Sequence, residues 1–342
     1  MAGRVRSNNH QDILSYQFQL PAYSIGSVIA QRTQHQGVIG QIHSVFKHVV
    51  NIAFLNGGLG SIVGSEVYRG PLSINVEIPK NMDMLSLGMK NNLSVSRVAD
   101  LIIIGESELA ISIENASLWE PVQLYNDVLS VSDIVERNLM KLREVARSYG
   151  KLDGLGLLIE LSEDELHDTE VATTLDIVPR LALPHLLNLI QTIKTKDLDN
   201  LPESVQHLVG LGPGLTPSGD DFLIGLMLSM LFIARNFKLD IDHIIDVNET
   251  IISCIPGRTT SISEEFLFQA ATGNANEPIL NLIETLLTSN SAQVERATRT
   301  VLAIGGTSGT DTILGILFGS LLMLSESTWF HEVIKSENAN YE

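Results

Sequence analysis

The pattern of apolar residues changes at about residue 131, and this change limits the folds open to the chain. Before it, short segments alternate apolar and polar residues, as in 73–78, where the isoleucines and the valine share one face. After it, apolar residues recur at helical spacing in one segment after another, to about residue 330. The sequence therefore predicts the α+β class, with a β-rich N-terminal part packed on a mainly helical C-terminal part.

Three segments follow from this division: a β-rich domain over residues 1–125, a mainly helical domain over 126–335, and a frayed polar tail over 336–342. Asn56-Gly57-Gly58 predicts a hairpin, because Asn-Gly readily adopts positive φ. Residues 42–50 fit helix or strand equally well. The expected strands are 50–55, 59–63, 73–78, 101–104 and 110–114, with one more at 154–160. The expected helices are 131–148 (capped by Ser130 or Ser132 and ended by Gly150), 175–194, 201–209, 219–236, 240–254, 261–272, 277–288, 291–303 and 308–325.

Composition excludes several classes of protein. With 22 Lys and Arg against 40 Asp and Glu, the net charge is −18. Nucleic acid would be repelled by that field, so only a local site for a small anion is compatible with it. The single cysteine, Cys254, excludes a disulfide framework and lies in an apolar run, which predicts a buried, inert thiol. The longest apolar run, 222–234, is shorter than the roughly 20 residues a bilayer requires. We expect a cytoplasmic protein with no membrane partner.

One segment stands out chemically. Residues 210–225 read GLGPGLTPSGDDFLIG, and the first ten of them, with four glycines and two prolines, lead abruptly into a long apolar helix. Backbone N–H groups and the hydroxyls of Thr216 and Ser218 are expected at the start of that helix. This arrangement suits an anion, because first-turn amides are unpaired and the helix dipole is positive there. Neither a Walker loop nor a dinucleotide-binding fingerprint is present.

The two aspartates of this loop allow three interpretations. Asp220 and Asp221 act on a substrate as acid or base, or hold a divalent cation such as Mg²⁺ through carboxylate oxygens, or complement the helix dipole in a loop that Ser218 caps.

A second segment, GGTSGTDTILG at 305–315, repeats part of the first. Ser308-Gly309-x-Asp311-x-x-x-Gly315 has the spacing of Ser218-Gly219-x-Asp221-x-x-x-Gly225, and both open long apolar helices. An internal repeat predicts two similar helix starts side by side, with glycines that allow close contact between the helices. A chance match of four fixed residues is the alternative.

A third segment, RTTSISEE at 258–265, places four hydroxyls before another helix. Ordinary capping explains it, or else the three helix starts converge on one pocket in which Arg258 is the anion partner. The predicted substrate-binding residues are Gly212, Gly214, Thr216, Ser218, Gly219, Arg258, Thr259, Thr260, Ser261, Thr307, Ser308 and Gly309.

Two residues of the N-terminal part are further candidates. His43 is a candidate acid or base, and Asn51 either orients a substrate or satisfies nearby polar groups. No histidine pair has metal-ligand spacing. The predicted catalytic residues are therefore Asp220, Asp221, Asp311 and His43, and the three aspartates are also the ligands expected for any metal.

These motifs carry a family resemblance. GLGPGLTPSGDDFLIG, TTSISEEF and GGTSGTD, together with GQIHSVFKHVVNIAFLNGGLGSIV and GPLSINV, resemble the AllH-type (formerly YlbF-type) bacterial family, long classed as a domain of unknown function. The resemblance runs from about Gly26 to Gly315. That family is similar to one subunit of the oxamate carbamoyltransferase of anaerobic allantoin catabolism, a route of purine degradation.

The resemblance implies a multi-subunit transferase. Its reaction converts oxalurate and phosphate into oxamate and carbamoyl phosphate, and its partners are an FdrA-type subunit and a further companion subunit, with a homo-oligomer also open. No catalytic residues carry over from the family. The Ser-Thr-Arg-Thr phosphate loop of ornithine and aspartate carbamoyltransferases is missing, since RTTS at 258–261 has another order. Kinship with that fold is therefore not assumed.

Two other functions compete with a catalytic transferase subunit. A noncatalytic scaffold or ligand-binding subunit would show assembly defects on mutation but little ligand binding by the isolated chain. A magnesium-dependent hydrolase using the three aspartates would lose activity on chelation.

Overall fold

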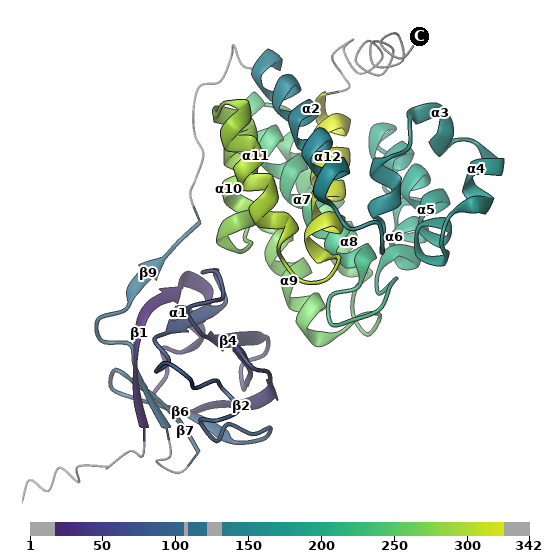
Figure 1. Ribbon diagram of the computed structural model, residues 1–342. Coiled ribbons are helices and arrows are strands. Elements are labelled where there is room, and N and C mark those ends of the chain that lie inside the picture. The colour runs from purple at the N-terminus through teal and green to yellow at the C-terminus, as the bar shows by residue number, and fades with distance from the viewer. Residues whose placement is uncertain (1–17, 106–108, 122–131, 325–342) are drawn as a thin grey trace, which may run out of the picture. The chain divides into compact units, whose positions relative to one another are not determined.

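The computed structural model describes residues 18–105, 109–121 and 132–324 (Figure 1). The chain divides into two units, Met1–Glu120 and Pro121–Glu342, and each is described by itself. The α+β class predicted from the sequence is confirmed. The predicted tail at 336–342 and the predicted cap at Ser130 lie outside the described residues.

The N-terminal unit is a β-barrel with one short helix, α1 (Ser27–Arg32). Its strands are β1 (Phe18–Gly26), β2 (Gly37–Val45), β3 (Val49–Phe54), β4 (Leu59–Val63), β5 (Ser73–Val76), β6 (Ser94–Val98), β7 (Leu101–Ile104), β8 (Leu109–Ser112) and β9 (Ser117–Trp119). They follow the order β5-β4-β3-β2-β6-β7-β8-β1-β9, and pairing between β1 and β5 closes the barrel. The undecided segment 42–50 thus contains strand, and the predicted hairpin is β3–β4.

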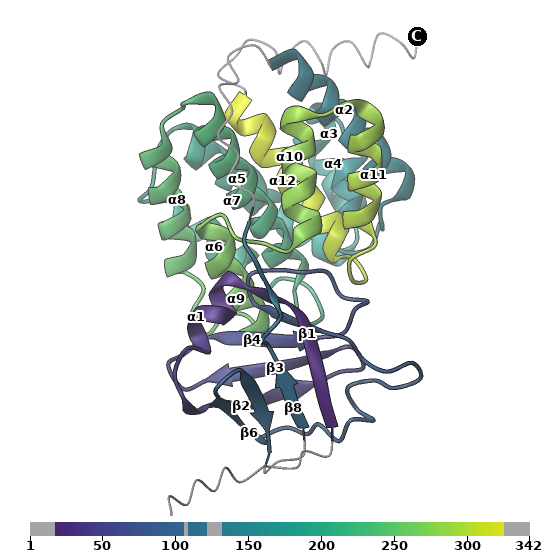
Figure 2. The ribbon, with the colours of Figure 1, turned by 90° about the vertical axis from the view of Figure 1, so that its left-hand side faces the viewer.

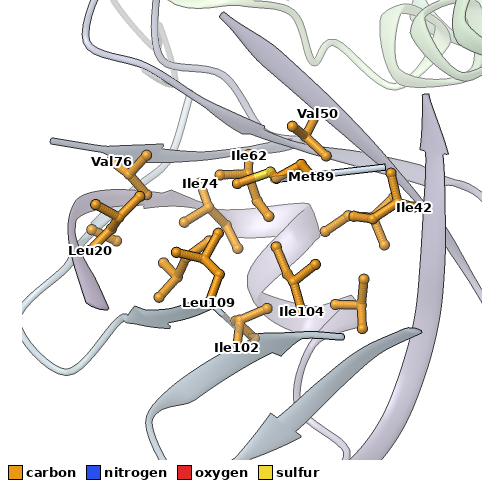
Figure 3. Packing of buried hydrophobic residues seen from close by; sticks show 14 of the residues in the cluster. Leu20, Ile42, Val50, Ile62, Ile74, Val76, Met89, Ile102, Ile104 and Leu109 are labelled. Atoms are coloured by element: carbon orange, nitrogen blue, oxygen red, sulfur yellow. The ribbon is translucent and has the colours of Figure 1, made fainter. Parts of the chain in front are cut away.

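The alternation of apolar and polar residues along the strands explains the barrel core. Ile42, Val50 and Ile62 come from three neighbouring strands, and each is completely buried. Figure 3 shows these side chains gathered in the interior with Ile74 of β5, Ile102 of β7 and others. Closing the sheet through β1 and β5 gives this unit a core of its own.

The C-terminal unit is helical. Its helices are α2 (Ser132–Tyr149), the 3₁₀ helix η1 (Gly156–Ile159), α3 (Glu163–Leu166), α4 (Thr169–Thr174), α5 (Ile177–Lys194), α6 (Leu201–Leu208), α7 (Ser218–Phe237), α8 (Ile241–Ser253), α9 (Ser261–Ala271), α10 (Glu277–Thr288), α11 (Ser291–Leu302) and α12 (Ser308–Leu324). The long helices predicted from apolar spacing are present, with ends shifted by one or two residues. Within the described chain, no helix combines the length and apolarity needed to cross a bilayer.

The predicted strand at 154–160 is wrong. Residues Gly156–Ile159 form η1 instead, and the preceding residue, Leu155, gives its N–H to a side chain rather than to a strand. A Cβ on Gly156 would lie 1.8 Å from the Lys151 carbonyl oxygen, so the chain folds back on itself here. A short apolar run cannot by itself distinguish a strand from a buried helical turn.

Helices α7 and α12 form the centre of this unit (Figures 1 and 2). They pack through glycines in a reciprocal way. A Cβ on Gly225 would lie 2.1 Å from the Thr312 carbonyl oxygen, and a Cβ on Gly315 would lie 2.0 Å from that of Phe222. The two backbones are therefore in direct contact, which holds the starts of both helices next to each other.

The predicted burial of the cysteine is confirmed, while its inertness stays a prediction. Cys254 is buried and unpaired, and its Sγ lies 3.4 Å from the Thr250 carbonyl oxygen, as in a weak thiol hydrogen bond at the end of α8.

Candidate functional site

The internal repeat seen in the sequence is also a repeat in structure. Helix α6 leads through the glycine-rich loop into α7, and α11 leads through a shorter glycine loop into α12. The second residue of each helix bonds back to its own loop: Gly219 N–H donates to Leu211 O (2.9 Å), and Gly309 N–H donates to Ile304 O (3.1 Å). The two helix starts are therefore equivalent in conformation as well as in sequence.

Hydroxyls cross between the two helix starts. Thr216 Oγ1 and Ser308 Oγ are hydrogen-bonded at 2.9 Å, which joins the two loops. The Ser308 hydroxyl interacts with the Asp221 carboxyl, while the Ser218 hydroxyl interacts with the Asp311 carboxyl. Each aspartate is thus next to the serine of the other repeat.

Asp220 is surrounded by hydrogen-bond donors of the protein itself. Its carboxyl is completely buried and accepts hydrogen bonds from Gly210 N–H (2.8 Å), from Ser263 Oγ (2.7 Å) and from Thr259 Oγ1. Burial raises its pKa, and these three donors oppose the rise. The contacts fasten the glycine-rich loop and the start of α9 to α7, so Asp220 holds the site together.

Asp221 and Asp311 are buried, and each has one carboxyl oxygen without a hydrogen-bond partner. Asp221 is 5% exposed and Asp311 is 0% exposed, and the Oδ2 atom of each has no hydrogen-bond partner. Burial raises the pKa of Asp221 to about 8, and the neighbouring Asp311 adds to the rise. Burial also raises the pKa of Asp311 to about 6, against a hydrogen bond from the Leu155 N–H. Around neutral pH, Asp221 is therefore mainly protonated, which equips it to donate a proton.

The segment before η1 belongs to this site, although the sequence analysis missed it. Leu155 N–H donates to Asp311 Oδ1 at 2.7 Å, and Lys151 N–H donates to Thr310 Oγ1 at 3.0 Å. A Cβ on Gly154 would lie 2.7 Å from both Asp311 Oδ2 and Ser218 Oγ, so only glycine fits there. The signal available in the sequence was Asp153-Gly154, a turn dipeptide at the start of the segment 154–160 that was interpreted as a strand.

The start of α9 joins the other two helix starts. Thr259 bonds to Asp220, and Thr260 caps α9 by accepting from Ser263 N–H (3.1 Å) and donates to the Leu215 carbonyl. Arg258 is exposed and donates to Gln206 Oε1 (3.3 Å), so it is placed beside the loop rather than at the carboxyls. Ser261 is exposed.

Backbone donors remain available at the two main helix starts. The N–H groups of Ser218 and Ser308, the first residue of each helix, donate to no group in the described part of the chain. Gly212 and Gly214 have φ of +113° and +105°, which L side chains rarely adopt. Glycines in this conformation turn the loop around the helix start, as in anion-binding backbone nests.

The Thr307 side chain hydrogen-bonds to the Asp311 carboxyl, and its carbonyl accepts the N–H groups of Thr310 and Asp311 (2.8 and 3.0 Å). Pro217 plays the same part for Asp220 and Asp221 (3.0 and 3.1 Å). Both loops therefore enter their helices with the same hydrogen-bond pattern.

The metal prediction gains no support from geometry. Asp220 is committed to protein donors, and no group of three or more His, Cys, Asp or Glu residues placed to hold a metal ion occurs among the residues described.

His43 and Asn51 belong to the barrel unit, on β2 and β3. Asn51 donates to Ser44 Oγ (2.9 Å) and accepts from Ser61 Oγ (2.7 Å), while His43 Nδ1 lies 3.1 Å from the same Ser44 hydroxyl. The Asn51 side chain thus satisfies hydroxyl groups on the two neighbouring strands. A catalytic role of either residue stays a prediction.

Two family models match the chain. Residues 21–118 match the model described as the AllH family N-terminal domain, and residues 208–320 match the model described as oxamate carbamoyltransferase subunit AllH. The first match contains strands β2 to β8, and the second contains the starts of α7, α9 and α12. No solved structure matches the chain.

Proposed function

The chain belongs to the AllH family, and from this premise we propose that it supplies the substrate site of a carbamoyltransferase that converts oxalurate and phosphate into oxamate and carbamoyl phosphate. The proposal places the reaction in allantoin and purine degradation in the cytoplasm. It assigns an FdrA-type subunit and a further companion subunit as partners.

One observation carries the proposal: two equivalent helix starts lie side by side at the buried pair Asp221 and Asp311. Each start offers a free first-residue N–H, a serine hydroxyl and a positive dipole end. Such donors suit an anionic oxygen, and both substrates of this reaction are anions. The net charge of −18 leaves backbone dipoles and hydroxyls as the means of attracting them.

The chemistry requires one proton to move. A phosphate oxygen attacks the carbamoyl carbon of oxalurate, the bond from that carbon to the inner nitrogen breaks, and the nitrogen leaves as the amide of oxamate. The proton lost by hydrogen phosphate equals the proton gained by this nitrogen. Asp221, with a pKa near 8, is suited to give a proton to the leaving nitrogen and to recover one from the phosphate. The hydroxyls and amides beside it stabilise the oxyanion formed at the carbamoyl carbon.

Calorimetric titration tests this site. The chain is titrated with phosphate and with carbamoyl phosphate, with and without a chelator, and the same is done for Ser308→Ala and for Ser253→Ala as a matched control. Ser253 lies at the end of α8, where its hydroxyl bonds to Thr250 O (2.7 Å). We expect binding that survives chelation, that Ser308→Ala weakens about tenfold or more, and that the control leaves unchanged.

The other outcomes separate the competing functions. Binding that a chelator abolishes would favour a magnesium-dependent hydrolase. Absence of binding until the partner subunits are added would favour a scaffold or a composite site. It would contradict the proposal that this chain forms the anion site by itself.

A further inference from the structure

The two halves of the repeat differ at one place. In the second half, Asp311 Oδ1 accepts the Leu155 N–H at 2.7 Å. Gly154 packs against the other carboxyl oxygen, Oδ2, which would lie 2.7 Å from a Cβ built on this glycine. The segment before η1 therefore supplies Asp311 with a backbone donor and covers it completely, in agreement with its exposed fraction of 0%.

In the first half, the neighbouring segment serves a different residue. The start of α9 directs its hydroxyls, those of Thr259 and Ser263, to Asp220 rather than to Asp221. Within the described chain no backbone N–H donates to Asp221, whose carboxyl is contacted only by the hydroxyls of Ser308 and Thr216 and whose Oδ2, like that of Asp311, has no partner although the residue is only 5% exposed. A buried carboxyl oxygen without a donor is costly, unless a ligand supplies the donor.

We infer that Asp221 binds the amide nitrogen of the substrate, and that the ligand N–H takes the place at Asp221 that the Leu155 N–H has at Asp311. This inference rests on the proposed function. It adds the residue that recognises the leaving nitrogen, the atom whose bond to the carbamoyl carbon breaks. The pseudo-symmetric pair thus has one closed member, Asp311, which positions the η1 segment, and one open member, Asp221, which contacts the substrate.

Recognition of an N–H by a carboxyl predicts a definite specificity. Oxamate and oxalate have the same shape and differ in one group, an amide in oxamate and a second carboxylate in oxalate. The Asp221 carboxyl accepts from the amide of oxamate, whereas an ionised Asp221 repels the second carboxylate of oxalate. Asparagine at this position presents an NH₂ group and favours oxalate instead.

The experiment compares oxamate and oxalate binding by calorimetry, for the full chain and for Asp221→Asn and Asp311→Asn, between pH 6.5 and pH 9.5. Both ligands are fully ionised throughout this range. For the unmodified chain we expect oxamate to bind about tenfold or more tightly than oxalate at pH 9.5. The preference should shrink as the pH falls through about 8, where Asp221 takes up a proton and can donate to oxalate.

Each variant has its own expected result. Asp221→Asn should remove or invert the preference and make it independent of pH. Asp311→Asn, the same chemical change at the equivalent position, should lower both affinities in parallel and keep the preference.

Failure of the inference differs from failure of the proposed function. If the chain binds both ligands and phosphate, but the ratio between oxamate and oxalate is the same in Asp221→Asn as in the unmodified chain, then Asp221 does not recognise the nitrogen and the anion site stands. If neither ligand nor phosphate binds, with or without the companion subunits, the proposed function fails and the inference fails with it.

Discussion

Asp220 and Asp221 follow each other at the start of α7, and the rotation of about 100° per helical residue sends their carboxyls to different neighbours. Asp220 meets the glycine-rich loop and the start of α9, where three donors are present. Asp221 meets the start of α12, where hydroxyls and a second carboxyl are present. Adjacent residues of one type therefore have different environments, one filled by protein donors and the other the place where our proposal puts the chemistry.

Removing the Asp220 carboxyl should destabilise the helical unit. Asp220→Ala leaves the Gly210 N–H and two hydroxyls without their acceptor in a buried place, and we expect a loss of about 3 kcal/mol in the free energy of unfolding, measured by urea denaturation. Asp240→Ala is the matched control, since Asp240 is an exposed cap of α8 and its loss should cost clearly less than that of Asp220. Equal losses in the two variants would contradict the structural role of Asp220.

The raised pKa of Asp221 predicts how stability changes with pH. The folded chain holds a proton on Asp221 up to about pH 8, whereas the unfolded chain releases it near 3.8. The resulting stabilisation is complete below the unfolded pKa and is lost as the pH rises through about 8. Asp221→Asn does not titrate, so its free energy of unfolding should exceed that of the unmodified chain above pH 8 by a few kcal/mol, at about 1.4 kcal/mol per pKa unit.

Thermal unfolding between pH 4 and pH 9 measures this difference. Asp311→Asn provides the comparison, because its gain should be complete at a lower pH, near 6. Curves that stay parallel for the unmodified chain and Asp221→Asn would show that Asp221 is ionised in the folded protein at all these pH values.

At this scale the sequence indicated which residues cluster, but not their contacts. The spacing shared by 218–225 and 308–315 predicted two similar helix starts, since equal spacing along a helix places equal residues on equal faces. The serine of each repeat contacts the aspartate of the other repeat, and Gly154 and Leu155 contact Asp311. These contacts depend on how distant segments pack. No local pattern contains that information.

At the level of elements, the contact between α7 and α12 decides the geometry of the site. Gly315→Ala should force the two helices apart, because its Cβ would lie 2.0 Å from the Phe222 carbonyl oxygen. We expect a loss of at least about 3 kcal/mol in stability, measured by thermal and urea unfolding. Gly306→Ala is the control, since its Cβ would meet no atom within 4 Å and should change stability by less than about 0.5 kcal/mol. A Gly315→Ala protein as stable as the control would show that the helices can separate.

Helices were predicted well because each is amphipathic or wholly apolar over many residues, which is the strongest local signal. Short strands with clear alternation or a turn on one side, such as β3, β4 and β5, were also found. Strand β6 was missed, because its five residues, SVSRV, pair through backbone hydrogen bonds and carry only one fully buried side chain. The failure at 154–160 has the related cause that four apolar residues fit more than one conformation.

For the whole molecule, the division into two units predicts which of them binds the anion. Each unit has a core of its own, so residues 121–342 expressed alone should fold and bind phosphate with a Kd within about threefold of that of the full chain. Circular dichroism establishes folding, and calorimetry measures the binding. A folded fragment that binds no phosphate would mean that the barrel unit contributes groups, and His43 and Asn51 would then be the first residues to substitute in the full chain.

The pairing of α7 with α12 also has a consequence for synthesis of the protein. Almost every side chain of α7 is buried, and part of its cover is a helix that leaves the ribosome last among the described elements. A nascent chain that ends before residue 308 therefore carries an apolar helix with its glycine surface uncovered, and this intermediate is a natural client for chaperones. Because Ser308 and Asp311 arrive with α12, no chain that ends before residue 308 can assemble the proposed binding site, and ligand binding would report that translation has passed this point.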